Sequence, residues 1–251
     1  MTEEQPSGTT IAFEQVEKGF DGRKVLDKVS FTVAQGEAIC ILGRSGTSKS
    51  VTLKLMIGLL QADAGKVRVK GEDMSALDED GLAKVRRKMG FLFQSAALFD
   101  SFTLNENLAL PLHRLDRNKS PEEIKRTVEE TLGEVGLEKD GNKMPSALSG
   151  GMQKRAGLAR ALVLQPEILL VDEPASGLDR ITASEIDDLL MKVKTERHTT
   201  MVIVTHDIHG ARKIADKFAV LDQGRLLAFG TPQELDSRND NRLQHFIAER
   251  C

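Results

Sequence analysis

Cysteine is scarce in this sequence, which has only two among 251 residues. Cys40 lies inside the apolar run 38–42 and is expected in the core, and Cys251 is the last residue. Two cysteines placed in this way are poor candidates for a disulfide framework or a metal site. Their scarcity favours a protein of a reducing compartment.

Long apolar runs and an excess of basic charge are also missing. No run approaches the roughly 18–20 apolar residues of a membrane helix, and the opening MTEEQPSGTT is acidic and polar, unlike a signal peptide. The formal net charge is −3 and the pI is near 6.0, whereas nucleic-acid binders usually carry a basic bias. We therefore expect a globular protein without nucleic-acid partners, which could serve a membrane only from the side.

What the chain does contain is an alternation of strand-like and helix-like segments, which favours an α/β fold. Strands are expected at 11–16, 29–33, 37–42, 66–69, 90–93, 168–171, 201–205, 218–221 and 225–229, with Gly224 turning the last two into a hairpin. Helices are expected at 51–60, 121–135 and 150–164. Strand signals disappear between 95 and 164, so one α/β core interrupted by a helical subdomain is the economical interpretation.

Residues 43–50 read GRSGTSKS, which nearly matches the phosphate-binding pattern G-x-x-x-x-G-K-[ST]. The stretch follows a buried-type strand and precedes a helix, so its backbone N–H groups and the helix N-terminus would favour a phosphate. Lys49 would reach the β- and γ-phosphates, and the Ser50 hydroxyl would bind Mg²⁺. Ser48 stands where the pattern has its second glycine, and an ordinary serine-rich turn is the alternative.

A second candidate lies at 168–174, ILLVDEP, where a buried-type strand runs into two carboxylates. Asp172 would hold Mg²⁺, and Glu173 would polarise an attacking water as general base. Pro174 suits the end of the strand because it cannot donate to a sheet ladder. A strand that ends in solvated acids would look the same.

A third candidate is the stretch 148–155, LSGGMQKR. Ser149 can cap the following helix, and Gly150 and Gly151 allow a close backbone approach. A capped helix N-terminus that can be approached closely is a second anion site. A merely structural helix start would explain the serine, but not two glycines that cost helix stability.

Together these stretches resemble the nucleotide-binding domain of ABC transporters, over about residues 11–235 and with the family's motifs in order. The resemblance implies an ATPase that binds ATP and Mg²⁺. It also implies a P-loop NTPase (RecA-like) core with an antiparallel β subdomain and an inserted ABC α-helical subdomain. The domain would span 9–237, with the core at about 9–94 and 165–237, the helical subdomain at about 95–164, and a tail at 238–251 that is either a short docking helix near 243–247 or frayed.

The resemblance assigns roles residue by residue. Gln94 matches the Q-loop glutamine, Asp179 ends a D-loop-like S-G-L-D, and His206 matches the switch histidine. Phe20 stands where the family usually has a tyrosine that stacks on adenine. The implied catalytic residues are Lys49, Gln94, Glu173 and His206, and the implied metal ligands are Ser50, Gln94 and Asp172. The implied nucleotide-binding residues are Phe20, Gly43, Arg44, Ser45, Gly46, Thr47, Ser48, Lys49, Ser50, Val51, Ser149, Gly150, Gly151 and Asp179.

A head-to-tail homodimer with two ATP molecules between the subunits is also implied. Each site would take residues 43–50, Asp172, Glu173 and His206 from one chain, and Ser149 and Gly151 from the other. Since a triphosphate needs more donors than one loop supplies, a bridging γ-phosphate would make dimerisation depend on ATP. Hydrolysis would then remove the bridge.

Residues 93–107, FQSAALFDSFTLNEN, resemble the Mkl/MlaF group, the ATPases of systems with MCE-domain proteins that move lipids between membranes. This implies a peripheral ATPase on the cytoplasmic face of the inner membrane that drives an integral-membrane, MlaE-like permease for phospholipids or related lipids. Leu98, Phe99 and Phe102 could form an apolar cup for a coupling helix of that permease, or pack inside the helical subdomain.

Two other functions stay open. LSGGMQ also occurs in the ATPases of amino-acid importers, so a small-solute importer is the first alternative. A soluble ABC ATPase of translation or DNA repair is the second, although the single motif set and the lack of a long heptad run argue against it. Intact Lys49, Glu173 and His206 disfavour a catalytically dead binding module.

Overall fold

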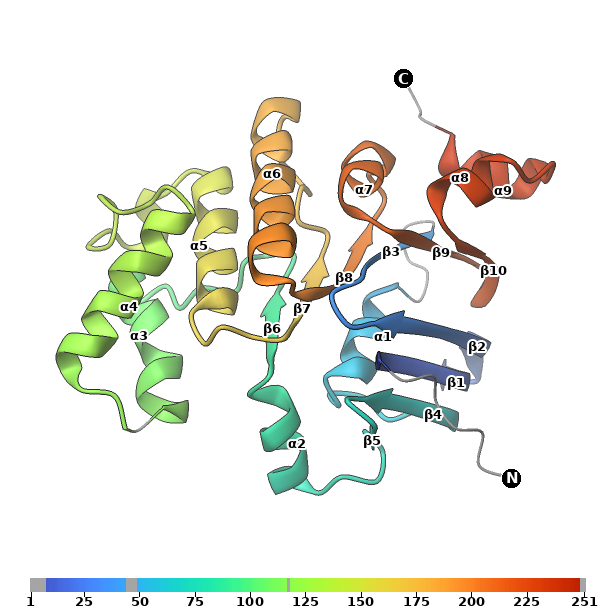
Figure 1. The fold of residues 1–251 in the computed structure, drawn as a ribbon, viewed down its shortest axis with the longest axis horizontal. Coiled ribbons are helices and arrows are strands. Elements are labelled where there is room, and N and C mark those ends of the chain that lie inside the picture. The colour runs from blue at the N-terminus through green and yellow to red at the C-terminus, as the bar shows by residue number, and fades with distance from the viewer. Residues whose placement is uncertain (1–7, 44–48, 117, 249–251) are drawn as a thin grey trace.

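The structure is a computed structural model that describes residues 8–43, 49–116 and 118–248, and a six-stranded sheet forms its centre (Figure 1). The strands of this sheet are β3 (Ala38–Gly43), β6 (Met89–Leu92), β7 (Ile168–Asp172), β8 (Thr200–Thr205), β9 (Lys217–Asp222) and β10 (Arg225–Gly230). Their order is β10-β9-β3-β8-β7-β6. Neighbours pair in parallel except β9 and β10, which form an antiparallel hairpin.

Alternate residues of the central strands pack into two hydrophobic clusters on opposite faces of the sheet. Ile39 and Ile41 of β3 belong to one cluster, and Ala38 and Cys40 belong to the other. Both β3 and β8 are buried along their whole length, as expected of parallel strands that are covered on two sides.

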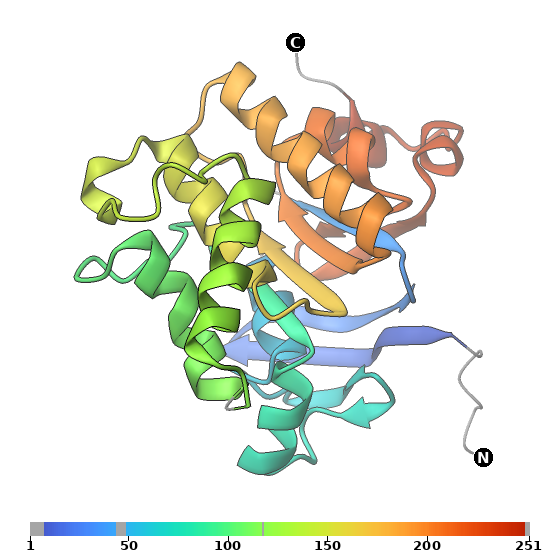
Figure 2. The same cartoon turned by 60° about the vertical axis from the view of Figure 1, so that its left-hand side comes forward.

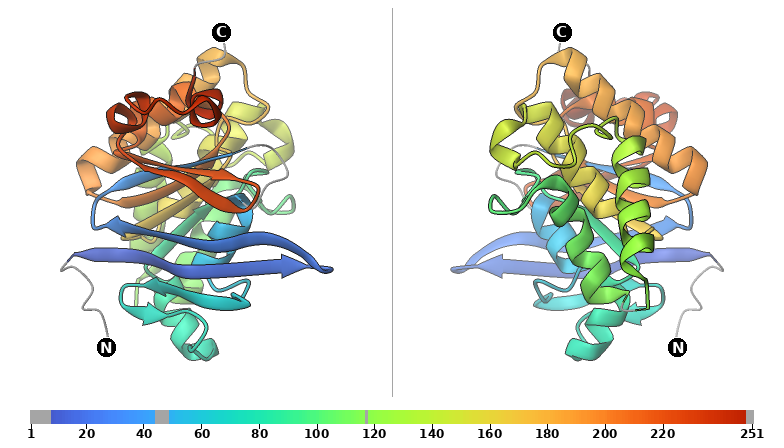
Figure 3. Two further views of the ribbon diagram at one scale, coloured as in Figure 1. Left: turned by 90° about the vertical axis from the view of Figure 1, so that its right-hand side faces the viewer. Right: turned by 90° about the vertical axis from the view of Figure 1, so that its left-hand side faces the viewer.

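One face is covered by α1 (Lys49–Met56) and by an antiparallel sheet whose long hairpin runs alongside the centre (Figure 3). The strands of this second sheet are β1 (Thr9–Phe20), β2 (Arg23–Ala34), β4 (Ala64–Val69) and β5 (Glu72–Asp73). The rings of Phe13 and Phe31 stack across β1 and β2 with their centroids 4.7 Å apart. A short helix, α2 (Glu79–Arg86), then leads into β6.

A helical group lies at one end of the molecule (Figure 2). It consists of α3 (Leu104–Leu115), α4 (Pro121–Glu134), the 3₁₀ turn η1 (Pro145–Ala147) and α5 (Gly150–Leu162), which share a hydrophobic cluster of their own. Capping boxes at Thr103 and Ser120 start α3 and α4, since each hydroxyl satisfies an N–H that the first turn leaves unpaired. Only α5 also packs into the core, through Leu158 and Leu162.

The other face is covered by the remaining helices, α6 (Arg180–Arg197), α7 (Ile208–Ile214), α8 (Pro232–Asp236) and α9 (Asn241–Ile247). Leu243 and Ile247 of α9 are buried in the core cluster, so the segment near 243–247 is a helix packed on its own chain. Among the residues described, no helix is both long and apolar enough to cross a bilayer.

The predicted strands are present, and most extend by one or more residues beyond the expected bounds. The helix expected at 51–60 was wrong at its end, because α1 stops at Met56 and Gly58 takes a left-handed backbone with φ +70°. Helices α2, α3, α6, α7 and α8 were not expected; α2, α7 and α8 are short, and α3 contains Pro111. The hairpin turn at Gly224 is confirmed, with φ +81°.

Candidate active site

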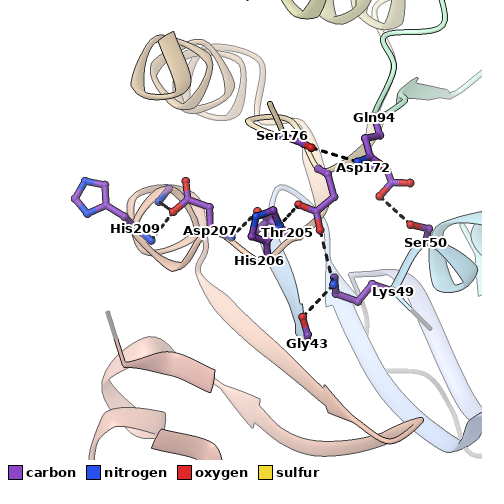
Figure 4. Close-up of polar contacts among 12 residues, drawn as sticks. Gly43, Lys49, Ser50, Gln94, Asp172, Ser176, Thr205, His206, Asp207 and His209 are labelled. Atoms are coloured by element: carbon purple, nitrogen blue, oxygen red, sulfur yellow. Dashed lines mark hydrogen bonds and ion pairs between the residues drawn. The ribbon is translucent and has the colours of Figure 1, made fainter. Parts of the chain in front are cut away.

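The carboxyl ends of three neighbouring parallel strands meet at one edge of the central sheet. Lys49 begins α1 after β3, Asp172 ends β7 with Glu173 directly after it, and His206 follows β8. This edge is where open α/β sheets bind their ligands. The three strand ends therefore bring four predicted site residues together (Figure 4).

Asp172 and Ser50 form the first pair in this group. The Ser50 hydroxyl donates to Asp172 Oδ1 at 3.0 Å. Burial raises the pKa of Asp172, the Ser50 hydrogen bond opposes that rise, and the charge of Glu173 adds to it. A hydroxyl beside a carboxylate is a set of hard oxygen ligands, which fits Mg²⁺ shared with phosphate oxygens.

Glu173 is held in place through both its backbone and its carboxylate. Its φ of +47° lies in the left-handed region, a conformation that costs a non-glycine residue about 1–3 kcal/mol and is typical of active sites. Its N–H donates to Val204 O of β8 at 2.8 Å. One carboxylate oxygen lies 2.7 Å from His206 Nδ1 and the other 3.7 Å from Lys49 Nζ.

Lys49 is almost completely buried and also donates to Gly43 O at 2.9 Å. The lysine therefore bridges the end of β3 and the carboxylate of Glu173, and Val51 follows in α1. The predicted phosphate-loop residues Arg44, Ser45, Gly46, Thr47 and Ser48 lie outside the described residues.

Gln94 lies near the group without joining its polar contacts. Its side-chain amide donates to Ser176 Oγ at 3.2 Å. Gln94, a predicted metal ligand, therefore contacts the segment that follows β7. The Asp172 carboxylate is hydrogen-bonded to Ser50 instead.

The remaining predicted residues sit apart from the four clustered side chains. Ser149 Oγ accepts from Met152 N at 3.3 Å and caps α5, and Asp179 accepts from the first N–H groups of α6. Phe20, at the end of β1, is 43% exposed. Within one chain, the predicted nucleotide-site residues therefore do not all lie together: Ser149, Asp179 and Phe20 are separate from the four clustered side chains.

Gly151 corrects one step of the sequence argument. A Cβ added there would lie 2.3 Å from Thr182 Cγ2 of α6, so the close packing of α5 against α6 favours glycine at this position. Helix packing therefore offers a structural reason for Gly151, contrary to the expectation that a structural helix start would not explain both glycines. Gly150 meets only an ordinary contact, 3.6 Å from Leu178 Cδ2.

Sequence reasoning missed Lys154, which lies beside the site. Its ammonium donates to Gln94 O at 2.6 Å and to Glu173 O at 3.0 Å. A signal was present, because Lys154 shares a helical face with the apolar residues Leu158 and Ala161, and a charge on such a face needs buried partners.

Comparison with known proteins decides the family. The family model described as ABC transporter matches residues 26–176. The chain belongs to the ABC transporter family. The fold class predicted from the sequence is confirmed, since solved ABC cassettes share the architecture.

Curated ABC relatives cover nearly the whole chain. The "Probable ribonucleotide transport ATP-binding protein mkl" of Mycobacterium tuberculosis (strain ATCC 25618 / H37Rv) is 40% identical over 246 residues, or 98% of this chain and 68% of that protein. The "Methionine import ATP-binding protein MetN" of Corynebacterium diphtheriae is 39% identical over 247 residues, or 96% of this chain and 72% of that protein.

Two solved ABC structures show the same fold. The dimeric post-hydrolysis state of the cassette MJ0796, bound to ADP and Pi, has a TM-score of 0.81 and 35% identity and covers 88% of this chain and 98% of that one. The structure of cbiO1 from Clostridium perfringens has a TM-score of 0.83 and 29% identity and covers 92% of each chain. The chain is an ATP-binding subunit of an ABC transport system and an ATPase.

Proposed function

We propose that two copies of this chain close on two molecules of ATP, hydrolyse them with Mg²⁺, and drive a separate membrane permease. The observation that carries the proposal is the meeting of Lys49, Asp172, Glu173 and His206 at one sheet edge, with Glu173 held in a left-handed backbone. The same chain points Ser149 into its own helix cap. A second subunit would supply the Ser149 and Gly151 that each site lacks.

Each clustered residue has a role in this proposal. Lys49 would bind the β- and γ-phosphates, and Ser50, Asp172 and Gln94 would hold Mg²⁺, which neutralises phosphate charge when bound. Glu173 would take a proton from the attacking water, and His206 would hold the Glu173 carboxylate in position and contact the γ-phosphate. Phe20 would stack on the adenine.

The division into a core at 9–94 and 165–237 and a helical subdomain at 95–164 belongs to the same proposal. It is supported by the separate hydrophobic cluster of α3, α4 and α5. The Q-loop residue Gln94 stands at the boundary, where a movement of the helices would reach the site.

For the transported substrate we propose phospholipid or a related lipid, with an MlaE-like permease and an MCE-domain protein, at the cytoplasmic face of the inner membrane. The resemblance of residues 93–107 to the Mkl/MlaF group and the similarity to mkl support this. Phe99 is 48% exposed and its ring lies 5.7 Å from that of Phe102, which favours an apolar cup over complete packing inside the helices.

The second candidate is a small-solute importer ATPase, because methionine importer subunits are almost as similar to this chain. To separate the two, a tagged Glu173→Gln chain would be expressed in its native host and extracted gently with its membrane partners. We expect an MlaE-like permease, an MCE-domain protein and bound phospholipid to co-purify. A different permease would discard the lipid proposal and keep the ATPase mechanism.

A further inference from the structure

The buried lysine of α5, Lys154, contacts two residues of the site through their backbone. It is only 6% exposed, and its ammonium donates to Gln94 O at 2.6 Å and Glu173 O at 3.0 Å. Burial lowers the pKa of Lys154, while the carboxylates of Glu173 and Asp172 favour its charged form. A cation kept out of water in this way needs such partners.

The Glu173 main chain is thereby held from two sides. Its N–H donates to Val204 O of β8, and its carbonyl accepts from Lys154. The same carbonyl also accepts from the Ser176 N–H at 3.2 Å, within the turn that follows. These bonds hold the left-handed main chain of Glu173, whose carboxylate lies against His206 and Lys49. A non-glycine residue keeps such a conformation only where its surroundings determine it.

Arg160 holds the neighbouring segment in the same manner. Its guanidinium donates to Ala97 O at 2.5 Å and Ala96 O at 3.3 Å, and both alanines have left-handed backbones. Two cations of α5 therefore satisfy the carbonyls of residues 94, 96 and 97, but only Lys154 also reaches Glu173.

We propose that Lys154 is a positioning residue for hydrolysis, which fixes the backbone of Glu173 and couples it to α5 and to Gln94. Ser149 caps α5, and Lys154 lies in the same helix. A contact at Ser149 that displaces α5 would therefore move Lys154 and, through it, the main chain of Glu173. The inference rests on the proposed role of Glu173 as general base.

The test uses the full-length chain carrying Lys154→Met, which keeps the aliphatic stem and removes the donors. We expect kcat for ATP hydrolysis to fall by about 10- to 100-fold, as for a misplaced catalytic group, while KM for ATP changes by less than about three-fold. Lys154→Arg, which can still donate to both carbonyls, should recover most of the lost kcat. An unchanged kcat, or a loss confined to KM, would overturn the proposal.

The control is Lys194→Met, which removes a lysine that donates to Ile214 O at 2.9 Å away from the site; its kcat should stay within about two-fold of the parent. If Lys154→Met does not fold, Lys154→Gln replaces it. Failure of both variants to fold would assign Lys154 a purely structural role and overturn the proposal.

A double variant separates this inference from the function on which it rests. Glu173→Gln alone must slow turnover strongly, and if it does not, the proposed role of Glu173 fails. If it does, adding Lys154→Met should slow it by less than about two-fold more, because Lys154 acts through Glu173. A further 10-fold loss in the double variant would show that Lys154 acts independently and would contradict the inference.

Discussion

The two halves of the predicted nucleotide site are built in opposite ways. At the sheet edge, Lys49, Asp172 and Glu173 are partly or fully withdrawn from water and held by one another and by strand ends. At the start of α5, Ser149 is exposed and Gly151 is packed against Thr182. The first half is a set of largely buried charges that pair with one another, and the second is a capped helix end whose serine is exposed.

This difference indicates that the two halves would have different functions in the nucleotide site. In the proposed function the sheet edge binds phosphate and takes the proton from water, and its side chains already pair with residues of the same chain. The capped start of α5 presents an exposed helix N-terminus, which would dock on a ligand that another subunit holds. Substitutions in the two halves should therefore have different effects.

The largest effect is expected in the buried-charge half. Glu173→Gln should lower kcat for ATP hydrolysis by about 10²- to 10⁴-fold, the loss typical of removing a general base, with ATP binding retained. Steady-state turnover and nucleotide binding by the same preparation measure the two effects. Glu167→Gln, at the other end of the same strand segment, is the matched control, and equal turnover of both variants would remove Glu173 from its role.

The outward half should respond differently. Ser149→Asp keeps an N-cap acceptor but places a negative charge where the partner's γ-phosphate is proposed to bind. ATP-dependent dimerisation, followed by light scattering, should weaken by more than about 10-fold through charge repulsion, while ATP binding by the single chain changes by less than about three-fold. Ser149→Asn, which caps without charge, should dimerise more tightly than Ser149→Asp, and equal dimerisation by the two would argue against phosphate contact.

The buried carboxyl group of Asp187, in α6, should make the stability of the protein depend on pH. Burial and the nearby charge of Asp207 raise the pKa of Asp187 from 3.8 to about 6. The folded state binds this proton more tightly than the unfolded state, so stability from this group is present at low pH and is lost as pH rises from about 4 to about 6. Asp187→Asn should therefore gain stability relative to the parent as pH rises, by at most about 3 kcal/mol. Thermal unfolding of both proteins across this pH range measures the difference in stability. The same pH dependence in Asp187→Asn and the parent would contradict the prediction.

Close packing of the outward half can be broken and repaired. Gly151→Ala would place a Cβ 2.3 Å from Thr182 Cγ2, an overpacking that should cost about 1–3 kcal/mol in the free energy of unfolding. Thr182→Ser removes that methyl and keeps the hydroxyl that donates to Asp179. The double variant should recover most of the loss in urea unfolding, and no recovery would mean that Gly151 is required for another reason.

The smallest effect is expected in the phosphate loop. Serine has the same backbone N–H as glycine, and if position 48 requires a left-handed backbone, serine costs only about 1 kcal/mol there. Ser48→Gly should leave ATPase turnover within about three-fold of the parent. A gain or loss of orders of magnitude would show that the serine side chain itself matters.

The buried-charge half could be predicted from the sequence because strand and motif coincide there. Glu173 follows a continuous apolar run that predicts a buried strand. Parallel strands place their carboxyl ends at one edge of the sheet, irrespective of the conformation of the loops. The burial of Lys154 could be inferred from its helical face, but its role could not, since its acceptors are backbone carbonyls far away in the sequence. Gly151 was misjudged because its neighbour Thr182 lies on another helix. The local sequence pattern thus predicts which residues lie at the end of a strand, but not which residues a helix face contacts.

The central claim is that each site takes Glu173 from one chain and Ser149 from the other. Mixing the Ser149→Asp and Glu173→Gln chains tests it directly, since a mixed dimer would contain one site with both native residues. The account predicts that the mixture hydrolyses ATP well above the mean of the two separate variants. A rate equal to that mean would place both residues in the same site of one chain and contradict the account.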